Sequence, residues 1–437
     1  RIFSLLKTTP NVKISKLMTK LFKNYWLYLL LIFYFVPIFF LGILKVWDTD
    51  IWFHVKSGEI ISKFGLIHAD VFSYRTAGRE WFPYEWLFQI IIYQFQAFFG
   101  FDAIKLFTAF CITSMVGSMI LIFRAVFKLN FSLSLIFGFF FFVGVYEFFA
   151  ARPYMLAYNF LFINLFLILN YYYRNKNLLW LSIPITYLWA NTHGSIFLDV
   201  AFFAAYSLIS LLNYLMFKDK IWLSKFKTLG FFTILTAVLT ILPPLGILQY
   251  KLLWIFYQKR YLITNFIDEW TALAENPIGF IFYSANVLIT LAMATYIILR
   301  LRLIKQLVPL LPYLILIFSA YTAARNVFLG YVGMSIILGW SFSKLDFKKL
   351  SKVDIVILTL FLLALLSYSF YVLPQKRTAP RMYYPEKASE FIKKYNLKGN
   401  MFNEYGYGGY LLYHLYPEHK VFIDGRTDLY LCCELSE

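Results

Sequence analysis

Apolar residues in this 437-residue chain arrive in blocks of about 20, the length that an α-helix needs to cross the hydrocarbon core of a bilayer. Hydrophobic residues make up 61% of the chain and aromatic residues 22%, more than a soluble protein of this size requires. The sequence therefore predicts an all-α polytopic membrane protein with about eleven transmembrane helices. We expect them near residues 25–46, 102–123, 130–149, 154–173, 178–191, 195–217, 228–245, 278–299, 306–323, 327–343 and 353–373.

One further apolar run, residues 86–99, is too short to span comfortably and is interrupted by Gln89, Gln94 and Gln96. We interpret it as an interfacial helix that lies on the membrane. It belongs to a first outer loop, residues 47–101, in a transmembrane domain that covers residues 1–373. Residues 374–437 then form a separate tail, which the sequence predicts to be incomplete.

The distribution of charge predicts the orientation of the chain. Alternation from a cytoplasmic N-terminus places six segments inside: 1–24, 124–129, 174–177, 218–227, 300–305 and 344–354. They hold 21 of the 41 Lys and Arg residues but only 3 of the 23 acids, so the whole net charge of +18 falls on one side. This is the positive-inside pattern, and it predicts a cytoplasmic N-terminus and an extracytoplasmic tail. Membrane orientation thus explains the basic balance without a nucleic-acid partner.

Most of the uncommon polar clusters fall on the opposite, electrically neutral side. They are the first outer loop, "ARP" (151–153), "NTHGS" (191–195), "FIDEW" (266–270), "AARN" (323–326) and the tail. Ionisable groups beside a bilayer are unfavourable unless they line water or pair with one another, so this grouping predicts one site at the outer face. The alternative is that they are ordinary loop residues and helix caps.

Asp50 and His54 are four positions apart, so a helix that starts near Asp50 places both on one face. Asp48 and Asp50 would then lie at its N-terminus, where carboxylates also serve simply as capping groups. Glu85, at the start of the interfacial helix, could bring a third carboxylate to the same place. Asp48, Asp50 and Glu85 together are candidate ligands for Mg²⁺ or Mn²⁺, although their spacing is not specific for a metal.

The stretch "DIWFH" (50–54), after a first span with its N-terminus inside, resembles the opening of the first outer loop in the C-type glycosyltransferase superfamily (GT-C). This superfamily includes the protein O-mannosyltransferases, the aminoarabinose transferases and the catalytic subunit of oligosaccharyltransferase. The tail from "RMYYPEKASEF" to "VFIDGR" (381–426) resembles that of an uncharacterised group of bacterial membrane proteins. The chain lacks a "KPPL"-type segment and a "WWDYG"-type motif, so donor and acceptor do not carry over from the better-known members.

The resemblance implies transfer of a sugar from a polyprenyl-phosphate donor to a glycan, lipid or protein acceptor at the outer face of a bacterial inner membrane. A phosphate leaves without a general acid, so one carboxylate must take the proton of the acceptor and cations must hold the phosphate. Asp50 is the expected base and Asp48 the alternative. The expected phosphate- and substrate-binding residues are His54, Glu85, Arg152, His193, Glu269 and Arg325. Arg152 and Arg325 could instead snorkel or form ion pairs, such as Arg152 with Glu147, and His193 could be structural.

The tail changes in character after Pro374. Its runs "NMFNEY" (400–405) and "KVFID" (420–424) predict strands, which with a helix near 385–396 would form a small extracytoplasmic α/β appendage. Asp424 and Arg426 in "VFIDGR" lie where a strand gives way to a turn, a usual place for ligand contacts. "YGYGGY" (405–410) either stacks on sugars or packs as a loop onto the membrane domain.

Two other classes of protein compete with a transferase. A lipid or polysaccharide transporter predicts inverted repeats and ionisable groups at mid-membrane depth, and the sequence has no obvious repeat. A non-catalytic scaffold of an envelope complex fits the composition but leaves the one-sided polar clusters without a purpose.

Overall fold

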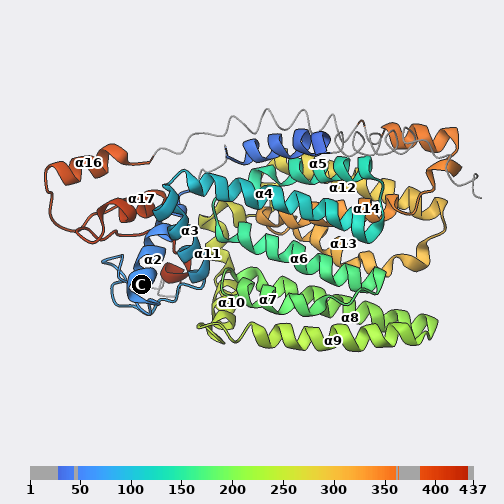
Figure 1. Cartoon of the computed structure of the whole chain (residues 1–437). Coiled ribbons are helices and arrows are strands. Elements are labelled where there is room, and N and C mark those ends of the chain that lie inside the picture. The colour runs from blue at the N-terminus through green and yellow to red at the C-terminus, as the bar shows by residue number, and fades with distance from the viewer. Residues whose placement is uncertain (1–27, 44–47, 361–362, 364–383, 432–437) are drawn as a thin grey trace, which may run out of the picture.

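The computed structural model describes residues 28–43, 48–360, 363 and 384–431, and within them every regular element is a helix. Long helices run side by side in one bundle, and shorter ones gather at one end of it (Figure 1). An all-helical architecture is therefore confirmed for the described residues, and the length and apolar composition of the helices given next support a membrane-embedded protein.

Six of the described helices are long and apolar enough to cross a bilayer. They are Ala103–Phe127, Phe131–Phe148, Pro153–Arg174, Gly194–Phe217, Lys220–Leu239 and Pro277–Arg300. The first joins α4 (Ala103–Leu121) to a π-helical turn, Ile122–Phe127, so the inner loop expected at 124–129 is largely helical. The others contain α5 (Phe131–Val145), α6 (Pro153–Arg174), α8 (Phe197–Phe217), α9 (Lys220–Leu239) and α12 (Pro277–Arg300).

The other expected spans are shorter helices or lie partly outside the described residues, so the count of eleven is not confirmed. The short ones are Tyr28–Ile43, α7 (Ser182–Ala190), α13 (Leu311–Ser319) and α14 (Val327–Phe342). A 3₁₀ turn, Leu179–Leu181, precedes α7, and another, Val308–Leu310, precedes α13. The last expected span, 353–373, is helical over 353–360 and at residue 363 but otherwise lies outside the described residues.

α14 is the centre of the bundle, because all sixteen of its residues are buried. It packs against α5, α12 and α13. Gly333 permits the close approach of α13, since a Cβ at this position would lie 2.5 Å from the carbonyl oxygen of Tyr313. Buried apolar area of this kind, with close packing, holds the helices together.

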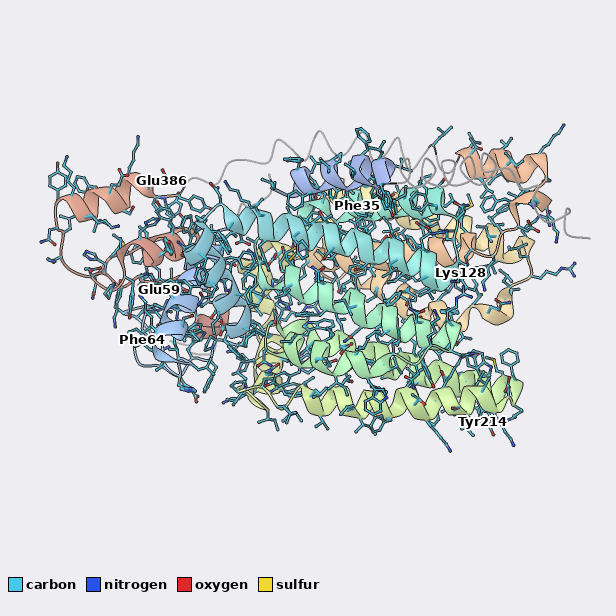
Figure 2. All side chains as sticks on the ribbon, in the orientation of Figure 1. Phe35, Glu59, Phe64, Lys128, Tyr214 and Glu386 are labelled. Carbon is cyan, nitrogen blue, oxygen red and sulfur yellow. The ribbon has the colours of Figure 1, made fainter. Side chains whose placement is uncertain are left out.

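The helices outside the bundle are α2 (Ile51–Phe64), α3 (Trp86–Phe99), α16 (Glu386–Lys394), α17 (Tyr405–Leu415) and α18 (Thr427–Leu431). α2 packs on both α3 and α17. Figure 2 shows Glu59, Phe64 and Glu386 at one end of the molecule and Lys128 and Tyr214 at the other. The first outer loop and the tail therefore share one end, opposite the basic turns that follow α4 and α8.

The expected strands of the tail are wrong over the described residues. Val421 makes one isolated bridge with Ser73, and "YGYGGY" is the start of α17. The Asn403 side chain takes the place of a partner strand, because its Oδ1 accepts from the Phe422 N–H at 2.8 Å and its Nδ2 donates to the Ile423 carbonyl at 2.8 Å. The described part of the tail is thus helices and irregular backbone that pack onto the first outer loop.

Candidate functional site

A cavity of about 180 Å³ lies where the first outer loop, the tail and the end of the bundle meet. Of the residues expected from the sequence, the cavity is lined by Asp50, His54, Glu85, Arg152, His193, Glu269, Arg325 and Arg426. It is smaller than most ligand pockets, so it has room for a head group rather than for a whole lipid. The expected convergence of Arg152, His193 and Arg325 on one cavity is therefore present.

Arg152 is the hub of the acidic side of this cavity. It has extended backbone immediately before Pro153, the first residue of α6, a position that proline suits because its missing N–H is not needed there. Its guanidinium pairs with Asp48, with Asp50 at 3.2 Å and with Glu269 at 2.8 Å. These partners, rather than Glu147, hold Arg152, and three carboxylates share one cation.

Asp50 precedes α2 but does not cap it through its side chain. Asp48 Oδ1 accepts from the Asp50 N–H at 2.8 Å, immediately before the helix begins. The capping alternative therefore fails for Asp50, whereas Asp48 holds the turn that leads into α2. Burial raises the pKa of Asp50 to about 7, with Arg152 acting against the rise and Asp48 and Glu269 adding to it. Asp50 is thus poised to exchange a proton near neutral pH.

Glu85 lies between two histidines on the other side of the cavity. Its carboxylate oxygens are 3.9 Å from His54 Nε2 and 3.7 Å from His193 Nε2. Burial lowers the pKa of both imidazoles, that of His193 to about 3, so both rings are neutral at pH 7. His193 Nδ1 accepts from the Ser195 N–H at 3.0 Å, which assigns the ring proton to the Nε2 that faces Glu85.

Burial also raises the pKa of Glu85 well above its usual range, with the nearby charges of Asp428 and Asp50 adding to the effect. Glu85 therefore keeps its proton to a higher pH than a carboxyl group in water does. Protonated, it can both donate to and accept from a hydroxyl group of a ligand.

Arg325 is the cation of the cavity that no described carboxylate pairs with. It lies in a 3₁₀ turn, Ala324–Asn326, before α14, and its guanidinium carbon is 4.3 Å from the centre of the Trp270 ring. The cation–π contact orients the side chain without neutralising its charge. Arg325 is therefore better placed than Arg152 to meet an anionic ligand.

Arg426 and Asp424 form a buried cluster beside the cavity. The guanidinium donates to Asp424 at 2.6 and 2.8 Å and to Asp70 of the first outer loop at 2.6 Å. It also lies between the rings of Phe72 and Trp81, 5.0 and 4.7 Å from their centres. These contacts tie the tail to the outer loop. The expected ligand contact of Asp424 and Arg426 stays a prediction.

Gly425, between these two residues, explains why "DGR" needs a glycine. A Cβ at this position would lie 2.2 Å from Asp50 Oδ1. The tail thus presses its backbone against the Asp50 carboxylate and closes one side of the cavity.

The expected metal ligands do not form a set. Among the residues that the structure describes, no group of three or more His, Cys, Asp and Glu side chains is placed to hold an ion. Asp48 and Asp50 form ion pairs with Arg152, and the histidines flank Glu85. A requirement for Mg²⁺ or Mn²⁺ stays a hypothesis.

Sequence reasoning missed several residues of the cavity wall, namely Tyr84, Tyr154, Asp428 and Ile263 of α11 (Arg260–Phe266). Tyr405, which also lines the cavity, belongs to "YGYGGY", for which stacking on a sugar was one of the two expected roles. Tyr84 and Tyr154 were detectable, since each is next to a residue of a polar cluster already singled out, Glu85 and Pro153 of "ARP". Ile263 is one apolar residue among many and gives no signal in the sequence.

These features define a helical membrane protein with an acid-rich cavity beside the end of its bundle. No model of a known protein family matches the chain, and no curated protein matches it.

Proposed function

We propose that this protein is a C-type membrane glycosyltransferase, which moves a sugar from a polyprenyl-phosphate donor to an acceptor at the extracytoplasmic face of the membrane. The observation that carries the proposal is Asp50: a carboxyl group with a pKa raised to about 7, in a cavity that also holds Arg325, a cation that no described carboxylate pairs with. Asp50 can act as the base, and Arg325 can stabilise an anionic leaving group.

The reaction requires few steps from the protein. The acceptor oxygen attacks the anomeric carbon of the sugar while its proton passes to Asp50. The bond from that carbon to the phosphate oxygen breaks, its electron pair stays with the phosphate, and Arg325 stabilises the resulting charge. Arg152 positions Asp50 and lowers its pKa, which keeps a useful fraction ionised at neutral pH. Glu85 and the neutral His193 hydrogen-bond to the sugar.

A direct test uses the full chain in proteoliposomes with a panel of radiolabelled polyprenyl-phosphate sugars and candidate acceptors. The proposal expects loss of label from the lipid that depends on protein and time, with polyprenyl phosphate as the second product. Absence of cleavage across the panel, with the donor shown to bind, would contradict it and favour a scaffold.

Transport of a lipid or polysaccharide is the second candidate, and one observation favours it. Asp199 is buried in the candidate span Gly194–Phe217, where it accepts from Thr186 at 2.5 Å and from Asn164 at 2.9 Å. Carboxyl groups within spans often belong to transport pathways. The test measures movement of the intact donor between leaflets. Loss of this movement in Asp199→Asn, with normal movement in Asp50→Asn, would establish transport instead.

A further inference from the structure

α10 (Leu248–Gln258) and α11 lie at the end of the bundle that also carries the cavity (Figure 1). Their outer surface is aromatic, because Trp254, Tyr257 and Tyr261 are exposed by 57%, 70% and 75%. Trp and Tyr side chains exposed at the end of a membrane bundle are typical of the lipid–water interface.

The same segment is basic. Lys251, Lys259 and Arg260 lie in it, and the sequence has no acid between Asp219 and Asp268. A surface with aromatic rings and cations but no carboxylate complements anionic lipid head groups. Glu275 is the one acid in the described lining of the groove considered next, and it follows this segment in the sequence.

A groove of about 1000 Å³ lies on the outer side of α11, lined in part by Arg260, Tyr261 and Thr264. Arg260 donates to the Thr322 carbonyl at 3.3 Å and has no carboxylate partner among the described residues. The groove reaches Asn276, next to α12, where Ile278 and Ile281 are exposed by 68% and 64%. An isoprenoid chain could lie against these apolar residues while its phosphate enters the groove.

α11 is the wall between this groove and the cavity. Ile263 and Ile267, one helical turn apart, face the cavity, whereas Arg260 and Thr264 face the groove. Ala324 lines the groove and the next residue, Arg325, lines the cavity. A phosphate in the groove is therefore separated from Arg325 by the thickness of one helix and one short turn.

We infer that α10 and α11 form the docking surface for the phosphate of a polyprenyl-phosphate lipid, with Arg260 as the cation that lines the groove and Lys259, at the junction of the two helices, as its neighbour in the sequence. This inference rests on the proposed function, because it names the place where the lipid-linked donor waits before transfer. The groove accepts the lipid from the bilayer and α11 controls its passage to Asp50.

The test measures binding without transfer. The full chain is reconstituted in phosphatidylcholine nanodiscs with radiolabelled polyprenyl phosphate, which has no sugar, and the retained lipid is titrated. We expect Lys259→Gln/Arg260→Gln to weaken binding about tenfold or more, since hydrogen bonds to charged groups are lost. The matched control is Lys220→Gln/Lys227→Gln, which removes two exposed cations from α9 away from the groove and should bind as the wild type does.

The outcomes separate the two ideas. Equal binding by both double variants and the wild type would overturn the docking surface but leave the proposed function standing. A wild-type protein that retains no polyprenyl phosphate would count against both. Displacement of the label by an equal amount of phosphatidic acid would show a general anionic-lipid surface and overturn the assignment to the donor. Resistance to that displacement is the result we expect.

Discussion

Arg152 Nη2 lies 3.2 Å from the Asp50 carboxylate, although one residue precedes α6 and the other precedes α2. Asp48 and Glu269 compete for the same guanidinium. Burial is the main reason that ionisation of Asp50 is disfavoured, and the excess of negative charge from three acids around one cation adds to it. This arrangement, rather than any single residue, gives Asp50 a pKa near neutral pH.

The rate of transfer should rise with pH through about 7, because Asp50 accepts a proton only when ionised. In Arg152→Gln the rise in rate should occur at a higher pH than in the wild type, since the cation that lowers the pKa of Asp50 is lost. In Arg325→Gln the rise should stay near pH 7. The rate itself should fall by about 10–100-fold, because a charge-assisted contact to phosphate is lost. Initial rates from pH 5 to 9 measure both, and identical profiles for the two variants would contradict the separate roles.

The raised pKa of Asp50 also makes the free energy of unfolding depend on pH. The folded-state pKa of Asp50 is raised from 3.8 to about 7, so folding favours the protonated form and this contribution is lost as pH rises across that window. We expect the difference in unfolding temperature between Asp50→Asn and the wild type to grow in favour of the variant from pH 5 to pH 8. A constant difference would mean that the pKa of Asp50 is not raised in the fold.

Arg426→Met should loosen the tail from the first outer loop. The change leaves Asp70 and Asp424 buried without their cation, and the loss of one partner from a buried pair typically destabilises by about 3–5 kcal/mol. Thermal unfolding and limited proteolysis of the tail measure it. Arg79→Met is the control, because Arg79 is exposed in the same loop. Equal protection of the two variants would show that the cluster does not tie these segments together.

Two glycines of α17 make a matched pair. A Cβ at Gly408 would lie 2.0 Å from the Ile423 carbonyl oxygen, whereas a Cβ at Gly406 would meet nothing within 4 Å. We expect Gly408→Ala to destabilise by about 1–3 kcal/mol through overpacking. Gly406→Ala should be neutral or stabilising by up to about 1 kcal/mol, as alanine suits a helix better. Similar unfolding temperatures for both variants would argue against the contact between α17 and residues 423–424.

The orientation is open to direct labelling. Glu418→Cys and Lys220→Cys are made in a background without the three native cysteines. They place exposed thiols at opposite ends of the molecule. We expect an impermeant maleimide to label Glu418→Cys in intact spheroplasts and Lys220→Cys only after permeabilisation. The reverse pattern would invert the proposed topology.

Much of the helical bundle was predictable, because apolar runs need helices whatever their tertiary contacts. The lengths were not: the runs expected at 178–191 and 306–323 form only the short helices Leu179–Ala190 and Val308–Ser319, each of which opens with a 3₁₀ turn. The grouping of Asp50, Arg152, His193 and Arg325 followed from their shared side of the membrane. The partners of Arg152 did not, since Glu269 is 117 positions away and nothing in the sequence ranks it above Glu147.

The tail shows the limit of local patterns. "KVFID" has the β-branched and aromatic residues that are typical of strands, but a strand needs a neighbour, and the Asn403 amide bonds to its backbone instead. "YGYGGY" contains three glycines and nevertheless forms α17, because Gly408 and Gly409 let the helix approach the backbone of residues 423–424 and Thr49. Tertiary contacts, which the sequence does not display, decide both segments.

The central claim is that Asp50 is the base, and the most direct measurement is the rate of sugar transfer by Asp50→Asn in proteoliposomes at pH 7.5. Asn keeps the size of the side chain but cannot take the proton, so the account predicts a loss of about 10²–10⁴ with the folded protein intact. Asp48→Asn, which keeps the cap on the Asp50 N–H, and Glu85→Gln should each retain more activity than Asp50→Asn. Wild-type turnover by Asp50→Asn, with transfer abolished in Asp48→Asn or Glu85→Gln, would assign the base elsewhere and contradict the account.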